Sequence, residues 1–501
     1  MRFFVLAFFF LSLGCSTTTE KNSRRPASSV DFISLVRKVQ ADLGNPSIYN
    51  PASCESYGQQ LTEYLFDKDS THFVPRTPAE KEELLKHGPT LVSDLFQIRL
   101  MIRERLRDFE SQGEVSPGCL QQMRRAFRYL RFASEFLSEW LIANGVFKVP
   151  AGKVLAGPFP ATEVNPAFQS ANLLPGDLLL MRGKSYISAM IARIGDEEGH
   201  FSHLAIVGED TKGNLYLVEA LIQTGSIIHP ISHFHDKELA RAVVYRHPDR
   251  ELAKRAARAA WEHVKSYREQ RGEAIRYDFA MDDSDASSLY CSELVQLAYR
   301  KVTNGSLVLP RYKTTAEELE KVGFLKSMSI RKSKFFAPSD IEFDTRFELV
   351  AEHRDFRFLR QNRIQDAVLQ SQFTWMKEKG YRYRGNAVYP SLAVLAKLLR
   401  QMGLLKEVFP KYMPIETVKT STWMRVSSGY LEKSLMEIEK NYFSKNGHSL
   451  TFKDLLAEVE KLRIEDCQKE EEVWKSSASN EEGKQRVPSQ FHWFFRGGSC
   501  R

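Results

Sequence analysis

One candidate nucleophile of the chain is Cys291, which stands at the start of an amphipathic pattern. Leu294, Val295 and Ala298 share a helical face with it, and the preceding run 282–288 is rich in residues that favour helix N-caps. We therefore predict that Cys291 lies in the first turn of a buried helix. There the helix dipole and the unpaired N–H groups favour a thiolate and can bind an oxyanion. A small cysteine packed into the core would give the same pattern.

A histidine and a glutamate lie on two apolar stretches that flank the polar, turn-like segment 209–214. If the two strands pair antiparallel about Thr211, His203 and Glu219 lie opposite each other on one face. A carboxylate fixes the tautomer of a histidine, and a histidine beside a thiol removes its proton. This is the nucleophile, base and orienting group of cysteine hydrolases. A core histidine and a solvent-facing glutamate are the alternatives.

Other motifs predict neither a metal site nor a cofactor. His229, His233 and His235 have a metal-like spacing, and neutral imidazoles suit zinc. Pro230 disfavours a helix there, however, and the sequence offers no fourth ligand. We expect a histidine-rich surface loop.

Length, charge and composition limit the class of protein. The 501 residues predict two to four domains. The net charge of +8 is modest, and no zinc-finger or RNA-binding signature accompanies it, so we expect no nucleic-acid partner. Residues 346–425 hold 15 Lys and Arg against 7 Asp and Glu, an excess that alone equals the charge of the whole chain.

The N-terminus predicts export. A basic start precedes an apolar run at 3–13, which is too short to span a bilayer and is typical of a signal peptide. The run ends in Ser12-Leu13-Gly14-Cys15, which resembles a bacterial lipobox. The resemblance implies cleavage before Cys15, lipidation of its thiol and a membrane anchor. Ser16 fits outer-membrane sorting in a Gram-negative cell, facing the periplasm. An ordinary signal peptide is the alternative.

In an exported protein the other cysteines are candidates for disulfides. Cys54 and Cys119 lie in the N-terminal region, and Cys467 and Cys500 lie near the C-terminus. Each pair could close a local loop, which would leave Cys291 as a free thiol.

The pattern along the chain divides it into five segments. Residues 1–14 are the predicted signal peptide and 15–29 a lipidated, flexible tether. Residues 30–148 are helical, with a capping box and a proline at 77–80. Residues 346–501 return to helical periodicity, for example at 392–399. On the predicted helix at 120–141 we expect one arginine row to form a solvated face: Arg124, Arg125, Arg128 and Arg131.

Residues 149–345 have an α+β pattern. Short apolar runs predict strands at 178–181, 203–207, 215–220 and 242–245. Helical periodicity follows at 251–268 and 290–302. We therefore predict an antiparallel sheet packed on helices and flanked by two mainly helical regions.

Several of these short motifs, taken in order, resemble the YiiX-like branch of the NlpC-type, permuted papain-like cysteine hydrolases, over about 173–314. In that branch the histidine strand precedes the nucleophile helix. The resemblance implies that Cys291 is the nucleophile, His203 the general base and Glu219 the third polar residue. The motifs that carry it are Pro175-Gly176-Asp177, Phe201-Ser202-His203-Leu204-Ala205-Ile206-Val207, Val218-Glu219-Ala220, Tyr277-Asp278-Phe279 and Tyr290-Cys291-Ser292-Glu293-Leu294-Val295.

Three functional classes follow. The first is a cell-envelope amidase or peptidase that forms an acyl-enzyme, with peptidoglycan peptides as a possible substrate. The second is a lipid-directed acyl hydrolase or transferase, in which the basic stretch 346–425 would hold anionic headgroups. The third is a non-catalytic envelope lipoprotein that uses the fold for binding or as a scaffold.

Overall fold

The structure is a computed structural model that describes residues 29–66, 74–149, 152–284, 286–383, 398, 410, 412–478 and 490–495. The predicted signal peptide, Cys15, nearly all of the tether and Cys500 lie outside these residues, as does most of the helical pattern predicted at 392–399. None of the described helices is both long and apolar enough to cross a membrane.

The N-terminal region is helical, as predicted. Helix α2 packs against α4, and α3 packs against both α1 and α4. The predicted cap is present, because the N–H of Glu80 donates to the Thr77 hydroxyl at 3.1 Å. A disulfide joins Cys54 to Cys119 and so links the start of α2 to the first turn of α4. The four helices are α1 (Ser29–Gly44), α2 (Cys54–Phe66), α3 (Pro78–Ser111) and α4 (Pro117–Ala143).

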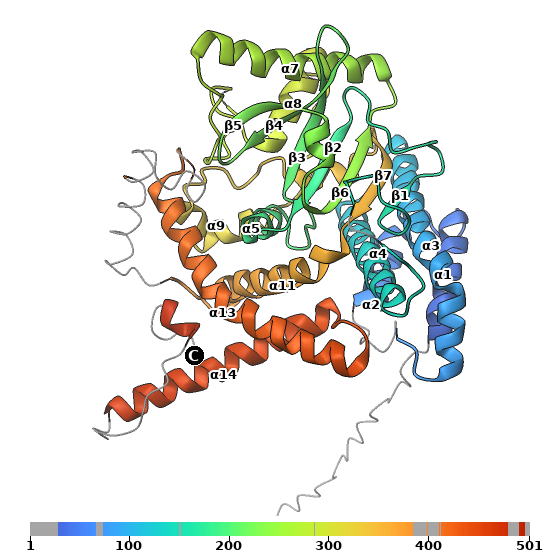
Figure 1. Ribbon diagram of the computed structural model, residues 1–501, viewed down its shortest axis with the longest axis vertical. Coiled ribbons are helices and arrows are strands. Elements are labelled where there is room, and N and C mark those ends of the chain that lie inside the picture. Colours follow the sequence, from blue (N-terminus) through green and yellow to red (C-terminus); the bar gives the residue numbers. More distant parts are fainter. Residues whose placement is uncertain are drawn as a thin grey trace, which may run out of the picture.

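A seven-stranded sheet lies at the centre of the molecule, in the order β1-β7-β6-β2-β3-β4-β5 (Figure 1). Every neighbouring pair is antiparallel, which confirms the predicted α+β class and its antiparallel sheet. The strands are β1 (Thr162–Val164), β2 (Leu178–Gly183), β3 (His203–Glu209), β4 (Leu215–Leu221), β5 (Gly225–Pro230), β6 (Leu239–Arg246) and β7 (Glu348–Arg354).

The four predicted strands lie in β2, β3, β4 and β6, and the other three are additions. Strand β7 pairs with both β6 and β1, so the sheet continues past residue 345, where we expected it to end. The sequence of β7 lacks a simple apolar alternation, because Glu352, His353 and Arg354 are buried in it. Their burial depends on partners elsewhere in the chain.

Both faces of the sheet are covered. Leu204, Ile206 and Val218 point into the main core, where α7 packs on β3, and α8 packs on β3 and β4. Ala205 and Leu217 point into a smaller cluster on the other face. The remaining elements are α5 (Tyr186–Gly195), α6 (Ser232–His235), α7 (Arg250–Arg271), α8 (Cys291–Val302), α9 (Thr315–Lys321), α10 (Phe324–Ser327), η2 (Pro338–Phe343), α11 (Phe356–Glu378), α13 (Ile415–Asn446), α14 (Phe452–Ala478) and η3 (His492–Phe494).

The prediction of a solvated arginine face on α4 is wrong for Arg124, Arg128 and Arg131, which are buried. Arg131 donates to Glu342 at 2.6 Å and to Glu352 at 3.1 Å. The carboxylate partners of the row come from segments far along the chain, so the local sequence gave no sign of them. This charge network attaches the N-terminal helices to the sheet. Arg125 keeps the predicted exposure in part and pairs with Glu198 at 2.8 Å.

The basic stretch 346–425 is also paired internally where the structure describes it. Arg363, for example, donates to Glu139 at 2.9 Å, and Arg425 donates to Glu432 at 2.6 Å. Much of the local positive charge is therefore matched by carboxylates of the same chain. The other described bases with a carboxylate partner are Arg346, Arg354, Arg357, Arg360, Lys377, Lys379 and Lys419.

The charge network leads to a stability prediction. Arg131→Met leaves the buried carboxylate of Glu342 without its closest partner, so we expect the free energy of unfolding to fall by about 3–5 kcal/mol. Arg125→Met, a matched change at a partly exposed position of the same helix, should cost about 0–1 kcal/mol. Urea unfolding of both variants measures the difference, and equal losses would contradict the assignment.

Candidate active site

Cys291 is the first residue of α8, and its side chain is buried. It lies in the first turn of a buried helix, because Leu294, Val295 and Ala298 pack into the core. The preceding backbone is held by Glu293, whose carboxylate accepts from the N–H of Tyr290 at 3.2 Å. The first N–H groups of a helix have no acceptor within it. Cys291 therefore stands where a negative charge is stabilised.

His203 and Glu219 are in contact, with 2.8 Å between Nε2 of the histidine and Oε2 of the glutamate. The Glu219 side chain is fully buried and that of His203 is 19% exposed. The predicted register is wrong by two residues, because Ile206 pairs with Val218, which puts Ala205 rather than His203 opposite Glu219. A shift of two preserves the face, and diagonal neighbours on one face are still within reach.

Lys237 is a member of this cluster that the sequence analysis missed. Its ammonium group donates to Glu219 at 3.0 Å (Oε1) and 3.3 Å (Oε2). Burial raises the pKa of Glu219, but the hydrogen bond from His203 and the positive charges of His203 and Lys237 outweigh it and lower the pKa to about 2. Glu219 is thus a carboxylate at neutral pH. Lys237 lies between α6 and β6, and no local pattern marks it.

The thiol and the imidazole stabilise each other as an ion pair. Burial raises the pKa of Cys291, but its hydrogen bond with His203 and the charge of that ring outweigh it, so the pKa is lowered. Burial lowers the pKa of His203, whereas its hydrogen bonds with Cys291 and Glu219 raise it to about 9. Since Glu219 holds Nε2, Nδ1 is the ring nitrogen available to the thiol. His203 is therefore an imidazolium near neutral pH, and its charge favours the thiolate form of Cys291.

Three further donors face the sulfur. The backbone N–H groups of Leu204 and Ser292 hydrogen-bond to Cys291 and lower its pKa. The hydroxyl of Tyr277 also hydrogen-bonds to Cys291, and burial together with the charge on Cys291 raises the pKa of that hydroxyl well above its ordinary value. Tyr277 therefore keeps its proton. It belongs to the motif 277–279 noted in the sequence, which had no role assigned to it.

Two histidines of the histidine motif, His229 and His233, form a second cluster that shares Glu219 with the active site. His235 is not part of it, and its Nδ1 bonds to the carbonyl of Val154 at 2.9 Å. Among the described residues, Glu219, His229 and His233 offer three ligand atoms within 4.8 Å of one another. These groups fit a divalent cation by type. The same Glu219 oxygens already bind Lys237 and His203, so a cation there would compete with the positive charge of the ammonium group.

The remaining cysteines lie away from this site. Cys54 and Cys119 form the disulfide between α2 and α4. Sγ of Cys467 lies 2.9 Å from Nε2 of His492, and its predicted partner Cys500 is outside the described residues. Cys291 is the free thiol among the cysteines that the structure describes.

Comparison with known proteins gives a family for the central part of the chain. Residues 172–323 match the family described as "Permuted papain-like amidase enzyme, YaeF/YiiX, C92 family". The matched segment contains Cys291, His203, Glu219, Lys237 and Tyr277. It indicates an enzyme of amidase or peptidase type with the permuted papain-like domain. It covers less than a third of the chain and leaves both helical regions outside.

One solved structure is similar, the "metalloprotein yiiX from Escherichia coli O157:H7". It is 17% identical, covers 36% of this chain and 97% of its own, and has a TM-score of 0.26. Among the curated proteins none matches this chain.

The ion pair predicts that Cys291 is alkylated at a lower pH than an ordinary thiol. Because the thiolate is present below the ordinary thiol pKa of about 8.5, iodoacetamide should label Cys291 with a midpoint clearly below that pH. Glu219→Gln removes the charge that stabilises the imidazolium and should move the midpoint upward. Peptide mass spectrometry over a pH series measures both, with His235→Gln as the control. A wild-type midpoint at or above 8.5 would show that no ion pair forms.

Proposed function

We propose that this protein is a cysteine hydrolase that cleaves amide bonds through an acyl-enzyme on Cys291. One observation carries the proposal: a buried thiol at a helix N-terminus hydrogen-bonds to His203, whose other ring nitrogen is held at 2.8 Å by the buried Glu219. A structural cysteine needs neither partner. The family match to amidases supports the same type of chemistry.

In the first step the thiolate of Cys291 attacks the carbonyl carbon of the substrate. An S–C bond forms, and the carbonyl oxygen becomes an oxyanion that N–H groups at the start of α8 and the Tyr277 hydroxyl are placed to bind. The imidazolium of His203 then gives its proton to the leaving nitrogen as the C–N bond breaks. The amine departs and the acyl group stays on Cys291 as a thioester.

In the second step a water molecule replaces the amine. Neutral His203 removes a proton from the water, and the resulting hydroxide attacks the thioester carbonyl. The S–C bond breaks, the carboxylic acid leaves and the thiolate returns beside the imidazolium. Glu219 stays ionised throughout and stabilises the imidazolium whenever it forms, as the third group of a catalytic triad does. Lys237 keeps Glu219 charged and is a positioning residue.

The proposed location is the bacterial cell envelope, with the chain held to the membrane by a lipid on Cys15. The N-terminal apolar run and the lipobox-like Ser12-Leu13-Gly14-Cys15 support it. Peptidoglycan peptides and membrane lipids are both within reach of an enzyme anchored there. Metabolic labelling with a fatty-acid analogue tests the anchor, since Cys15→Ala should abolish the label.

Removal of the thiol should end catalysis. We expect Cys291→Ala to lose all turnover of a cell-envelope extract, because no other described group is placed to form the acyl-enzyme. Mass spectrometry of the products, against the wild type, measures the loss. An unchanged thermal unfolding curve serves as the control for folding. Persistent turnover by the variant would contradict the mechanism.

The pH dependence of turnover should follow the ion pair. Activity rises as Cys291 ionises, and it falls as the pH passes about 9, because neutral His203 has no proton for the leaving amine. Glu219→Gln should move the alkaline limb of kcat to lower pH. Glu238→Gln, an exposed carboxylate 19 residues along that pairs with Lys184, is the matched control. An alkaline limb at the same pH in both variants would show that Glu219 does not stabilise the imidazolium of His203.

A further inference from the structure

A second buried cysteine stands beside a histidine and an aspartate that the proposed reaction does not use. Sγ of Cys467 on α14 lies 2.9 Å from Nε2 of His492, and Nδ1 of His492 lies 2.9 Å from Oδ2 of Asp466. All three residues are buried. Cys467 is disulfide-bonded, unlike Cys291, so it is not a nucleophile for acyl transfer. The chemistry open to it is thiol–disulfide exchange.

Asp466 fixes the orientation of the histidine ring. Its carboxylate accepts from the backbone N–H of Gln490 at 2.8 Å and from those of Phe491 and His492 at 2.9 Å. Burial raises the pKa of Asp466, but the hydrogen bonds from the His492 ring and from these N–H groups outweigh it and lower the pKa. Because a carboxylate only accepts hydrogen bonds, Nδ1 of His492 carries the proton. Nε2 is then the nitrogen that faces the sulfur.

Two more groups that donate hydrogen bonds surround the sulfur. Nη1 of Arg463 lies 3.7 Å from Sγ of Cys467 and donates to the Tyr381 hydroxyl at 3.2 Å. That hydroxyl lies 2.8 Å from Nε2 of His492 and 3.9 Å from Sγ of Cys467. Arg463 also pairs with Glu460 at 2.7 Å, which holds the guanidinium in place. A cation and hydrogen-bond donors next to a sulfur favour its thiolate form.

The disulfide between Cys54 and Cys119 has different surroundings. It is also buried, and Sγ of Cys54 contacts the Tyr49 hydroxyl at 3.3 Å. Among the residues that the structure describes, no Lys, Arg or His hydrogen-bonds to either sulfur. A thiolate formed there would lack a cationic partner, and burial would disfavour its charge. The chain therefore holds two buried disulfides whose polar surroundings differ.

We propose that the disulfide of Cys467 is redox-active and exchanges with thiol reductants, with Cys467 as the thiolate that leaves. A reductant thiolate bonds to the partner sulfur, which we predict to be that of Cys500, outside the described residues. The S–S bond breaks, and its electron pair stays on Sγ of Cys467, where Arg463 and a protonated His492 stabilise it. A second reductant thiolate then resolves the mixed disulfide.

Overall, two reductant thiols become one disulfide, and the protein gains two electrons and two protons. A stabilised leaving thiolate speeds this exchange and shifts its equilibrium toward the reduced protein. The inference does not depend on the proposed function. It gives the chain a second cysteine centre, for disulfide exchange, in addition to the proposed acyl transfer at Cys291.

A redox titration with glutathione tests the inference, and the Cys54–Cys119 disulfide is the comparison within the same molecule. The full chain is equilibrated with mixtures of reduced and oxidised glutathione, from both the oxidised and the reduced protein. After acid quenching, thiols are alkylated in urea and each cysteine peptide is quantified by mass spectrometry. The Cys467 disulfide should be half reduced at a ratio of squared reduced to oxidised glutathione at least tenfold lower than Cys54–Cys119. Equal ratios, or the reverse order, would overturn the inference.

Substitutions identify the groups that stabilise the leaving sulfur. Arg463→Gln and His492→Gln should each raise the glutathione ratio at half reduction of the Cys467 disulfide at least threefold, while the ratio for the other disulfide stays unchanged. Lys461→Gln is the matched control, since Lys461 lies on α14 and its side chain is 63% exposed. Folded variants that both titrate like the wild type would contradict the proposed stabilisation of the thiolate. The wild-type comparison needs no variant, so it decides the inference even where a substitution prevents folding.

Discussion

The buried carboxylate of Glu219 is the group on which the rest of the site depends. Glu219 is fully buried, and its neighbours in strand β4, Val218 and Ala220, are apolar. A buried charge is costly unless it is paired. His203 and Lys237 supply that pairing from two sides. One consequence is an imidazole held in a fixed orientation, with its second nitrogen free for Cys291. The other is a charge that favours the imidazolium and, through it, the thiolate.

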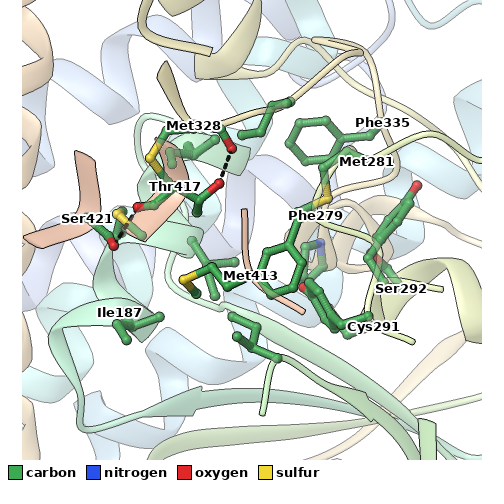
Figure 2. A pocket seen from close by; sticks show the side chains of 18 of the residues that line it. Ile187, Phe279, Met281, Cys291, Ser292, Met328, Phe335, Met413, Thr417 and Ser421 are labelled. Atoms are coloured by element: carbon green, nitrogen blue, oxygen red, sulfur yellow. Dashed lines mark hydrogen bonds between the residues drawn. The ribbon is translucent and has the colours of Figure 1, made fainter. Parts of the chain in front are cut away.

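The sheet, α8 and the two helical regions position the active-site residues. Strands β3 and β4 set His203 and Glu219 on one face of the sheet, and α8, which packs on both strands, carries Cys291 at its N-terminus. The helical regions outside the family match also have definite contacts. The N-terminal helices are attached through the arginines of α4. In the C-terminal region, Thr417 and Ser421 of α13 line a cavity that Cys291 also lines (Figure 2). Both helical regions therefore contact the central domain, which carries the active site and lies between them in the sequence.

Much of this was predictable from local sequence. The strands of the central hairpin, the helix of Cys291 and the capped helix α3 follow from periodicity and caps, which act over a few residues. The contact of His203 with Glu219 was also predicted, although the register was wrong, because an error of two residues preserves the face.

What sequence reasoning missed depends on partners distant in the chain. The arginines of α4 look like a solvated face until Asp196, Glu342 and Glu352 are brought to them. Strand β7 carries charges that are tolerated only inside that network. Lys237 has no local signature at all, since its role arises only where separate segments of the chain meet at the site.

Glu219 and Cys291 together keep His203 protonated at neutral pH. An NMR titration of the His203 ring measures its protonation state. We expect His203 to stay an imidazolium up to about pH 9 and its pKa to fall in both Cys291→Ala and Glu219→Gln. A wild-type ring that titrates near the ordinary histidine value of about 6.5, unaffected by either substitution, would contradict it.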